Sequence, residues 1–157
     1  MKTAKCISML QVVCPDFNKC IELDKNNNTK KSTICKFLHG GILQLTYYCG
    51  SAPICTKGGN FDVIQRAKYN VEAYYSLVGM AQDLKRSFEL LEVLLPAFFS
   101  GAKSIFKEDL KFNKNKHPPI KNDTLKALMK IPAIQGELEF YHFAQQRFEK
   151  QYKTFLT

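Results

Sequence analysis

The chain has 157 residues and a net charge of +9, because 23 lysines and arginines outnumber 14 acidic residues. This length suits one domain, and a composition of 45% hydrophobic and 24% charged residues excludes a disordered chain or a fibre. No run of about 18 apolar residues occurs, so the sequence predicts no membrane-spanning helix. The positive charge favours anionic partners such as nucleic acid, acidic polysaccharide, a phosphorylated cofactor or an anionic membrane.

All the cysteines lie in the first 55 residues, at positions Cys6, Cys14, Cys20, Cys35, Cys49 and Cys55. There is no CxxC pair, and the histidines lack ligand-like spacing to the cysteines, which argues against a zinc site. An even number of cysteines in a loop-rich region favours disulfides in an oxidising compartment. The close pair Cys49 and Cys55 brackets a turn-forming stretch, Gly-Ser-Ala-Pro-Ile, that can bring two Cβ atoms together. The alternative is a cytosolic protein with six reduced, buried cysteines.

Two N-glycosylation sequons also favour the secretory pathway. They begin at Asn27 and Asn122, in polar stretches that we expect to be exposed loops. The first 14 residues make a poor signal peptide, because their apolar stretch is short and interrupted and no small-residue cleavage site follows. A luminal protein without an entry signal indicates that the natural N-terminus lies upstream of Met1.

In chain order, residues 1–60 predict a cysteine-rich loop region and residues 61–157 a helical region. The stretch 15–37 is polar and lysine-rich, which is typical of a surface excursion. Residues 43–48 alternate with β-prone side chains and predict a short strand. The pair Gly58-Gly59 lacks the spacing of a phosphate-binding loop and predicts a plain turn before a helix.

Hydrophobic residues at helical spacing predict core-facing helices in the second region. The first stripe comprises Phe61, Ile64, Ala67 and Val71. The second comprises Leu84, Phe88, Leu91 and Leu95. Pro96 then either kinks this helix or begins a new one with Phe98, Phe99, Ala102 and Ile105. Between the first two stripes, residues 73–78 are β-prone and predict a buried strand.

Residues 107–121 lose all hydrophobic periodicity and contain five lysines against two acidic residues. One interpretation is a solvated loop. The other is an anion-binding loop, in which Lys and Asn side chains surround phosphate or sulfate. Residues 124–129 then predict a short helix, and a final helix begins near Pro132. Its hydrophobic face comprises Leu138, Tyr141, Ala144, Phe148 and Tyr152.

No catalytic constellation follows from spacing alone. The sequence lacks a nucleophile elbow, an H-E-x-x-H motif, a Walker loop and a Rossmann fingerprint. No recognisable nucleic-acid module appears either, and the lysines lie in two loops rather than along one helix. We therefore expect neither a metal nor a nucleic-acid partner.

An ordered series of short motifs runs from Cys49 to Phe143. It comprises Cys49-Gly50, Cys55, Ala67-Lys68-Tyr69-Asn70, Tyr75-Ser-Leu-Val78-Gly79, Leu90-Leu91-Glu92, Leu95-Pro96-Ala-Phe98-Phe99, Gly101-Ala102 and Glu137-Leu-Glu-Phe140-Tyr141-His-Phe143. In this order and at this spacing, the series resembles the C-terminal half of the heparan sulfate and uronyl 2-O-sulfotransferases, including the insect Pipe-like members. The resemblance extends from about Asp16 to the end of the chain.

The resemblance implies an α/β P-loop sulfotransferase fold, of which residues 1–157 are a C-terminal, mainly helical fragment with one or two short strands. It implies transfer of sulfate from 3′-phosphoadenosine 5′-phosphosulfate to the 2-hydroxyl of a uronic acid in heparan sulfate or a related glycan or glycoprotein. It also implies a Golgi enzyme with a luminal catalytic domain, a membrane anchor outside this chain and assembly as trimers. The alternative is a catalytically inactive basic module of the secretory pathway that binds sulfated glycan.

The resemblance further implies two disulfides, Cys20–Cys35 and Cys49–Cys55, and a nucleotide-covering loop near residues 106–121. The cofactor-binding residues that it implies are Phe106, Phe112, Asn113, Lys114, Asn115 and Lys116. The family's P-loop, catalytic histidine and main uronate-binding arginines precede the matched region. We therefore expect no catalytic residue in this chain, and no activity from the chain alone.

Overall fold

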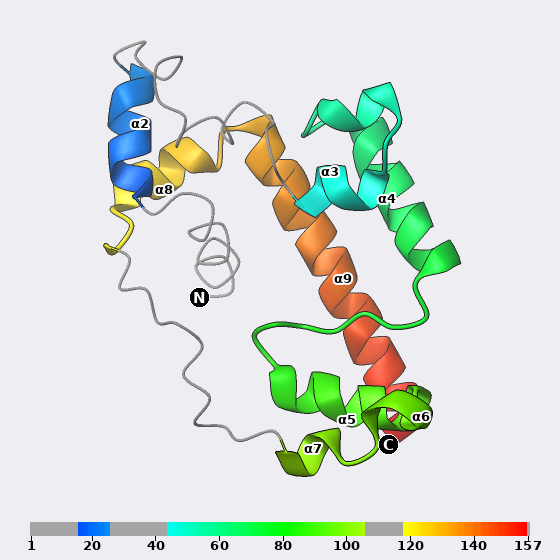
Figure 1. The fold of residues 1–157 in the computed structure, drawn as a ribbon. Coiled ribbons are helices and arrows are strands. Elements are labelled where there is room, and N and C mark those ends of the chain that lie inside the picture. The colour runs from blue at the N-terminus through cyan, green and yellow to red at the C-terminus, as the bar shows by residue number, and fades with distance from the viewer. Residues whose placement is uncertain (1–15, 26–43, 106–117, 157) are drawn as a thin grey trace. The chain divides into compact units, whose positions relative to one another are not determined.

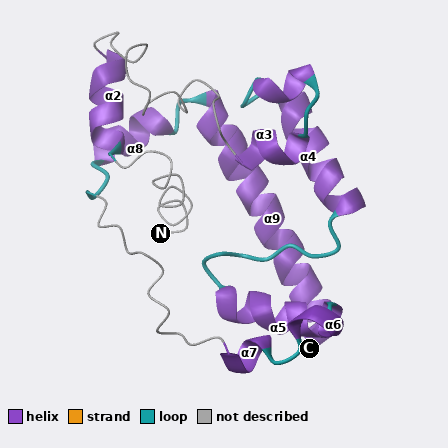
Figure 2. Cartoon of the chain, in the orientation of Figure 1, coloured by secondary structure: helices purple, strands orange, loops and turns teal. Residues whose placement is uncertain are grey.

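A computed structural model of the chain describes residues 16–25, 44–105 and 118–156 (Figure 1). The helices are α2 (Phe17–Lys25), α3 (Gln44–Cys49), α4 (Phe61–Tyr74), α5 (Leu84–Leu94), α6 (Pro96–Phe99), α7 (Ala102–Ile105), α8 (Asn122–Leu128) and α9 (Pro132–Leu156), with a short 3-10 helix, η3 (Pro53–Thr56). Within these ranges the structure contains helices and loops and no strand (Figure 2). None of these helices has both the length and the apolar character that crossing a bilayer requires. The mainly helical character predicted from the sequence is therefore confirmed.

The chain divides into two compact units. Unit 1 comprises Met1–Asn70 and Lys116–Tyr141, and unit 2 comprises Val71–Asn115 and His142–Thr157. Helices α4 and α9 are long enough to contribute residues to both units.

One part of the core of unit 1 forms where α2 packs against α8 and the first turns of α9. Its buried members are Phe17, Cys20, Ile21, Leu128, Ala133, Ile134 and Leu138. Asn18 on α2 adds two hydrogen bonds to the segment before α8. Its Nδ2 donates to the carbonyl oxygen of Pro119 at 3.0 Å, and its Oδ1 accepts from the backbone N–H of Lys121 at 3.0 Å. Apolar burial and these two bonds together attach α2 to α8.

A close backbone approach joins the turn before α4 to the start of α9. Gly59 in this turn has a φ of +85°, and a Cβ added there would lie 2.5 Å from the carbonyl carbon of Pro132. Gly136, one turn further along α9, lies beside the same turn. A Cβ on Gly136 would lie 3.2 Å from Cα of Gly59 and 3.1 Å from Cδ2 of Leu45. Position 59 therefore needs glycine, position 136 leaves little room for a Cβ, and the predicted turn at residues 58–59 is confirmed.

The strand predicted over residues 43–48 is wrong, because the described part of this stretch belongs to α3. In a helix, Leu45 and Cys49 lie one turn apart on the same face, and both are buried. The carboxylate of Glu137 also accepts the backbone N–H of Leu45 at 2.7 Å, which satisfies a donor in the first turn of α3. Alternation suggested a strand, but this buried carboxylate and the i, i+4 pair favour the helix.

The strand predicted over residues 73–78 is also wrong. Helix α4 continues to Tyr74, and the chain after it is irregular. The side chain of Gln151 on α9 accepts the backbone N–H of Val78 at 3.1 Å and donates to the carbonyl oxygen of Ser76 at 2.8 Å. Backbone groups that a strand would pair with a neighbouring strand are therefore satisfied by a helix side chain.

The predicted helices at residues 84–95, 124–129 and from Pro132 are confirmed, and Pro96 begins a new helix rather than kinking the old one. Not every predicted core position is buried. Phe61, Phe98 and Ile105 are 68%, 84% and 74% exposed. Each lies at or near the end of a helix, where helical spacing continues but the packing partner does not.

Candidate functional site

The predicted nucleotide-binding residues lie outside the described part of the structure. They are Phe106, Phe112, Asn113, Lys114, Asn115 and Lys116. The structure describes the chain up to Ile105, at the end of α7, and again from Pro118. On the N-terminal side of the predicted segment, the nearest described element is therefore α7, and the side chains that hold α7 in unit 2 are described as well.

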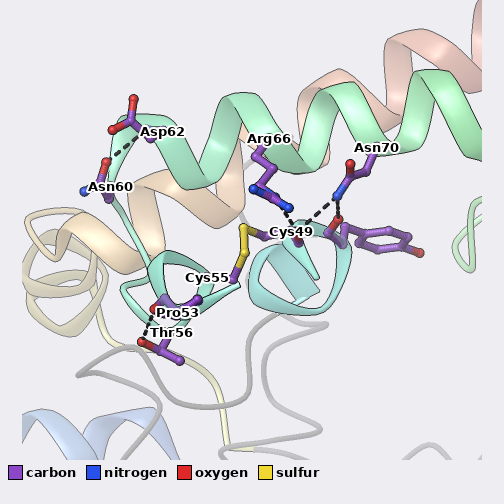
Figure 3. The surroundings of a disulfide bond; sticks show 9 residues. Cys49, Pro53, Cys55, Thr56, Asn60, Asp62, Arg66 and Asn70 are labelled. Atoms are coloured by element: carbon purple, nitrogen blue, oxygen red, sulfur yellow. Dashed lines mark hydrogen bonds between the residues drawn. A yellow bond between two sulfur atoms is a disulfide. The ribbon is translucent and has the colours of Figure 1, made fainter. Parts of the chain in front are cut away.

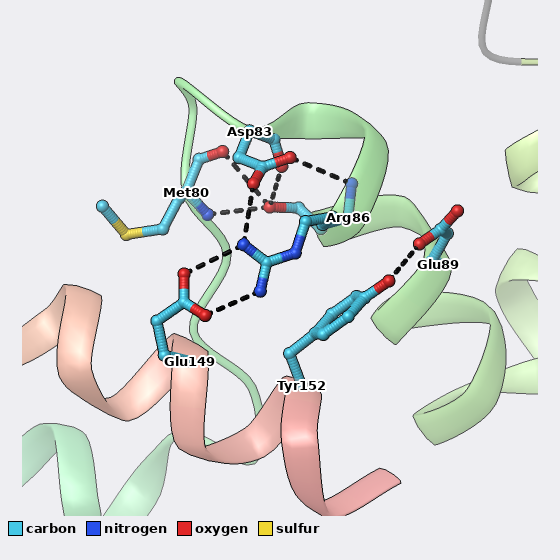
Figure 4. Close-up of polar contacts among 7 residues, drawn as sticks. Met80, Asp83, Arg86, Glu89, Glu149 and Tyr152 are labelled. Carbon is cyan, nitrogen blue, oxygen red and sulfur yellow. Dashed lines mark hydrogen bonds and ion pairs between the residues drawn. The ribbon is translucent and has the colours of Figure 1, made fainter. Parts of the chain in front are cut away.

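Arg86 of α5 lies at the centre of a polar cluster in unit 2 (Figure 4). Its guanidinium donates to both carboxylate oxygens of Glu149, at 2.9 and 2.7 Å, and to Asp83 at 3.1 Å. The guanidinium carbon also lies 4.1 Å from the ring centroid of Tyr152 and 5.1 Å from that of Phe148. The hydrogen bond to Glu149 raises the pKa of Arg86, so the guanidinium stays charged.

The start of α5 explains why Arg86 occupies this position. Asp83 caps the helix, since its Oδ1 accepts the backbone N–H of Arg86 at 3.3 Å. The hydroxyl of Ser87 donates to the carbonyl oxygen of Asp83 at 2.8 Å and accepts the backbone N–H of Met80 at 2.8 Å. The preceding turn is thereby fixed to the first turn of α5, and Arg86 projects from that turn toward α9 (Figure 4).

Glu89, one turn further along α5, joins three helices. It accepts a hydrogen bond from the hydroxyl of Tyr152 on α9 at 2.5 Å and pairs with Nζ of Lys103 on α7 at 3.0 Å. The bond from Tyr152 and the pair with Lys103 lower the pKa of Glu89, and the same bond to Glu89 raises the pKa of Tyr152. Together Glu89, Lys103 and Tyr152 form the Glu89 node.

The chemistry of this cluster is that of a scaffold. A general base needs a pKa near the working pH and an oxygen that can take a proton from substrate. The pKa values of Glu89 and Glu149 are both lowered, and the carboxylates already accept hydrogen bonds from Tyr152 and Arg86. The cluster therefore holds α5, α7 and α9 together.

In unit 1, a disulfide joins Cys49 at the end of α3 to Cys55 in η3 (Figure 3). These cysteines form the second pair that the resemblance implies. Two side chains of α4 hold the same turn. Nε of Arg66 donates to the carbonyl oxygen of Cys49 at 3.2 Å, and Nδ2 of Asn70 donates to the carbonyl oxygens of Tyr48 and Cys49 at 2.9 and 3.0 Å. The motif Ala67–Asn70 thus contains a contact to the disulfide turn that sequence reasoning did not find.

Cys20 is also disulfide-bonded, but Cys35, the partner that the resemblance implies, lies outside the described residues. Asn27 of the first sequon lies outside them too. Asn122 of the second sequon is exposed, as predicted, although it begins α8 rather than lying in a loop. Thr124 of that sequon is buried.

Glu137 is a buried carboxylate between α9 and α3. It is only 4% exposed, and it accepts the backbone N–H of Leu45 at 2.7 Å and a second backbone hydrogen bond from Gln44. Burial raises the pKa of Glu137 to about 7. An acidic residue next to Leu138 in an apolar stripe was the available sequence signal, since such a residue needs buried hydrogen-bond donors.

We expect the free energy of unfolding to fall as the pH rises from about 4.5 to about 7, because Glu137 binds a proton in the folded chain more tightly than in the unfolded chain. The stabilisation from this proton is fully present below the pKa that Glu137 has in the unfolded chain. It is lost as the pH rises through the pKa that Glu137 has in the folded chain. Urea unfolding of the wild type and Glu137→Gln between about pH 4.5 and 8 measures this, since other titrating groups cancel in the difference. Parallel pH profiles for the two proteins would contradict the assignment.

Metal ligands do not gather among the described side chains: no group of three or more His, Cys, Asp or Glu there is arranged to hold an ion.

Comparison with known proteins gives three informative relatives. The chain is 34% identical over 117 residues to heparan sulfate 2-O-sulfotransferase hst-2 of Caenorhabditis elegans, a match to 71% of this chain and 36% of that protein. It is 34% identical over 111 residues to heparan sulfate 2-O-sulfotransferase 1 of Homo sapiens, a match to 68% of this chain and 31% of that protein. It is 31% identical over 114 residues to uronyl 2-sulfotransferase of Homo sapiens, a match to 66% of this chain and 26% of that protein. The chain thus spans about a third of the length of the curated relatives it matches, and no family model matches it.

Proposed function

We propose that this chain supplies part of the sulfotransferase domain of a glycosaminoglycan uronosyl 2-O-sulfotransferase. The chain belongs with the heparan sulfate and uronyl 2-O-sulfotransferases, which it matches over 66–71% of its length. The match to these relatives is the observation that carries the proposal. Their names differ in the acceptor but share transfer to a 2-position. The proposed acceptor is therefore the 2-hydroxyl of a uronic acid in heparan sulfate or a related glycan or glycoprotein.

The proposed donor is 3′-phosphoadenosine 5′-phosphosulfate. In the reaction the 2-hydroxyl oxygen forms a bond to sulfur while the bond from sulfur to the phosphate oxygen breaks. A base takes the hydroxyl proton, and adenosine 3′,5′-bisphosphate leaves. We assign that base to a histidine outside this chain. The phosphate-binding loop of the P-loop sulfotransferase fold is also assigned outside this chain. The net charge of +9 suits both the anionic donor and a sulfated acceptor.

Within this chain, donor contacts are assigned to the lysine-rich segment that follows α7. The assigned residues are Phe106, Phe112, Asn113, Lys114, Asn115 and Lys116. Ammonium and amide N–H groups form charge-assisted hydrogen bonds with phosphate oxygens, which makes this residue composition suitable for a nucleotide bisphosphate. The remaining residues contribute the helical scaffold and the disulfides.

The proposal places this domain in the Golgi lumen, in a membrane-anchored protein that assembles as a homo-oligomer. The disulfide Cys49–Cys55 supports an oxidising compartment, because cytosolic thiols are kept reduced. The pair Cys20–Cys35 and glycosylation at Asn27 and Asn122 belong to the same proposal.

Replacing Lys114 by alanine in the natural full-length protein is expected to raise the apparent KM for the sulfate donor about three- to tenfold, with little change in kcat, because one charged phosphate contact is lost. Initial rates at varied donor concentration measure the effect. Lys126→Ala is the matched control, since this exposed lysine lies on α8, beyond the predicted loop of residues 106–121. An unchanged donor KM in Lys114→Ala would contradict the assignment of this residue.

A second candidate function is a catalytically inactive module that binds sulfated glycan. The net charge of +9 favours it as well. Salt-sensitive retention on heparin, combined with no sulfate transfer by the natural protein, would support this function over the enzyme.

A further inference from the structure

The sequon that begins at Asn122 combines an exposed and a buried residue. Asn122, the first residue of α8, is exposed, whereas Thr124 is only 6% exposed. An N-glycosylation sequon requires both the asparagine that receives the oligosaccharide and the hydroxyl residue two positions later. An enzyme that recognises this sequon must therefore contact Thr124 as well as Asn122.

The helical conformation of α8 also points these two side chains in different directions. Successive residues of an α-helix are rotated by about 100°, so residues at i and i+2 do not face each other. In an extended chain, side chains at i and i+2 lie on the same side. An extended segment can thus present Asn122 and Thr124 together to one active site, whereas α8 separates them.

Contacts with α2 hold α8 in place within unit 1 (Figure 1). Leu128 on α8 is fully buried, in the same cluster as Ile21 on α2. The side chain of Asn18 on α2 donates to the carbonyl oxygen of Pro119 and accepts the backbone N–H of Lys121, both at 3.0 Å. Lys121 directly precedes the sequon, so these bonds fix the backbone at the start of α8. Exposing the buried hydroxyl residue of the sequon therefore requires α8 to detach from α2.

We infer that Asn122 accepts an N-linked oligosaccharide only while α8 is detached from α2. The inference rests on the proposed function, because a secretory-pathway protein meets the oligosaccharide donor and its transferase. In the reaction, Nδ2 of Asn122 forms a bond to the anomeric carbon of a lipid pyrophosphate-linked oligosaccharide, and a base of the transferase takes the amide proton. The bond from that carbon to the pyrophosphate oxygen breaks, and the lipid pyrophosphate leaves.

The folded structure can carry an oligosaccharide at this position even though it does not present the sequon. Asn122 is exposed, so an oligosaccharide on its Nδ2 extends away from the buried residues of α8, while Thr124 and Leu128 keep their places. The order of events then decides the product. A chain that is modified early folds with its oligosaccharide, and a chain in which α8 packs first stays unmodified at Asn122.

The test compares folded and unfolded forms of the natural full-length protein. The protein is produced in cells in which synthesis of the lipid-linked oligosaccharide is blocked, so that Asn122 is unmodified. The folded protein, and a sample that has been unfolded, reduced and carboxymethylated, are incubated with oligosaccharyltransferase and lipid-linked oligosaccharide. Mass spectrometry of the peptide that contains Asn122 gives the rate of modification. We expect the unfolded chain to react at least about tenfold faster, because detachment of α8 is a minor state of the folded protein.

Asn18→Ala removes both hydrogen bonds from α2 to the segment before α8. It is expected to raise the rate for the folded protein about tenfold, because the rate follows the fraction of molecules with α8 detached. Arg86→Met is the matched control, since it removes two hydrogen bonds to Glu149 in unit 2. We expect this control to leave the rate at Asn122 unchanged.

Two results overturn the inference alone. One is an equal rate of modification for the folded and unfolded chains, and the other is a rate in Asn18→Ala no higher than that in Arg86→Met. An unfolded chain that is not modified at Asn122 overturns the proposed glycosylation of this residue as well. Sulfate transfer by the natural protein tests the proposed enzyme separately.

Discussion

Gly59→Ala is expected to lower the free energy of unfolding by about 3 to 5 kcal/mol. Two effects combine at this position. The φ of +85° is a left-handed conformation that costs an alanine about 1 to 2 kcal/mol. The added Cβ would also lie 2.5 Å from the carbonyl carbon of Pro132 and 2.6 Å from the backbone nitrogen of Ala133. Because both atoms are backbone, no side chain can rotate away, and the turn before α4 must separate from α9.

Gly50→Ala is the matched control for this substitution. Gly50 has a similar φ of +97°, but the nearest atom to an added Cβ is Nδ2 of Asn70 at 4.0 Å. We expect it to lose only the conformational part, about 1 to 2 kcal/mol. Urea unfolding followed by circular dichroism measures both variants. Equal losses at Gly50 and Gly59 would show that the turn does not approach α9 as closely as described.

Arg86→Met is expected to destabilise unit 2 by about 2 to 3 kcal/mol. The substitution removes two hydrogen bonds to Glu149 and one to Asp83, and it leaves two half-buried carboxylates without their cation. It also removes the cation–π contact with Tyr152. Arg86→Lys is expected to recover little of this, because an ammonium cannot bind both oxygens of Glu149 and lie flat on the ring.

The ion pair of Lys68 and Glu139 provides the comparison, since its side chains are 23% and 49% exposed. Lys68→Met is expected to cost about 1 kcal/mol or less. Thermal and urea unfolding of the two methionine variants, at the same ionic strength, compare the Arg86 cluster with this partly exposed ion pair. If Arg86→Met lowers the free energy of unfolding no more than Lys68→Met does, the cluster stabilises the protein no more than one partly exposed ion pair.

Local sequence signals were sufficient for most helices. The turn at Gly58-Gly59 and the long helix from Pro132 each follow from one or two residues with strong conformational preferences, whereas Pro96 left open whether a helix kinked or a new one began. Hydrophobic spacing then located the helices between them. These signals act over a few residues, so a single sequence contains them.

The two predicted strands failed because strand formation depends on partners far along the chain. Residues 43–48 alternate as a strand would, yet the carboxylate that favours α3 comes from Glu137, 92 residues away. The stretch after Tyr74 is similar, since Gln151 satisfies its backbone from 75 residues away. No local pattern records such contacts.

The polar cluster could not be predicted for the same reason. Arg86 and Glu149 are 63 residues apart, and neither belongs to a motif with recognisable spacing. Function was accessible by a different route, because an ordered series of short motifs resembled one enzyme family and the comparisons with named relatives agree with it. That series included Asn70 and Glu137, whose contacts to α3 only the structure defines.

The proposed enzymatic function is tested most directly by sulfate transfer. Native protein is captured from its source with an antibody against residues 107–121 and incubated with ³⁵S-labelled 3′-phosphoadenosine 5′-phosphosulfate. Two acceptors are compared, heparan sulfate with its 2-O-sulfates removed and the same polymer with its uronate 2-positions already sulfated. We predict label on the uronic acid of the first acceptor and little on the second. No label on either, from a protein that still binds heparin, would contradict the enzyme and favour the glycan-binding module.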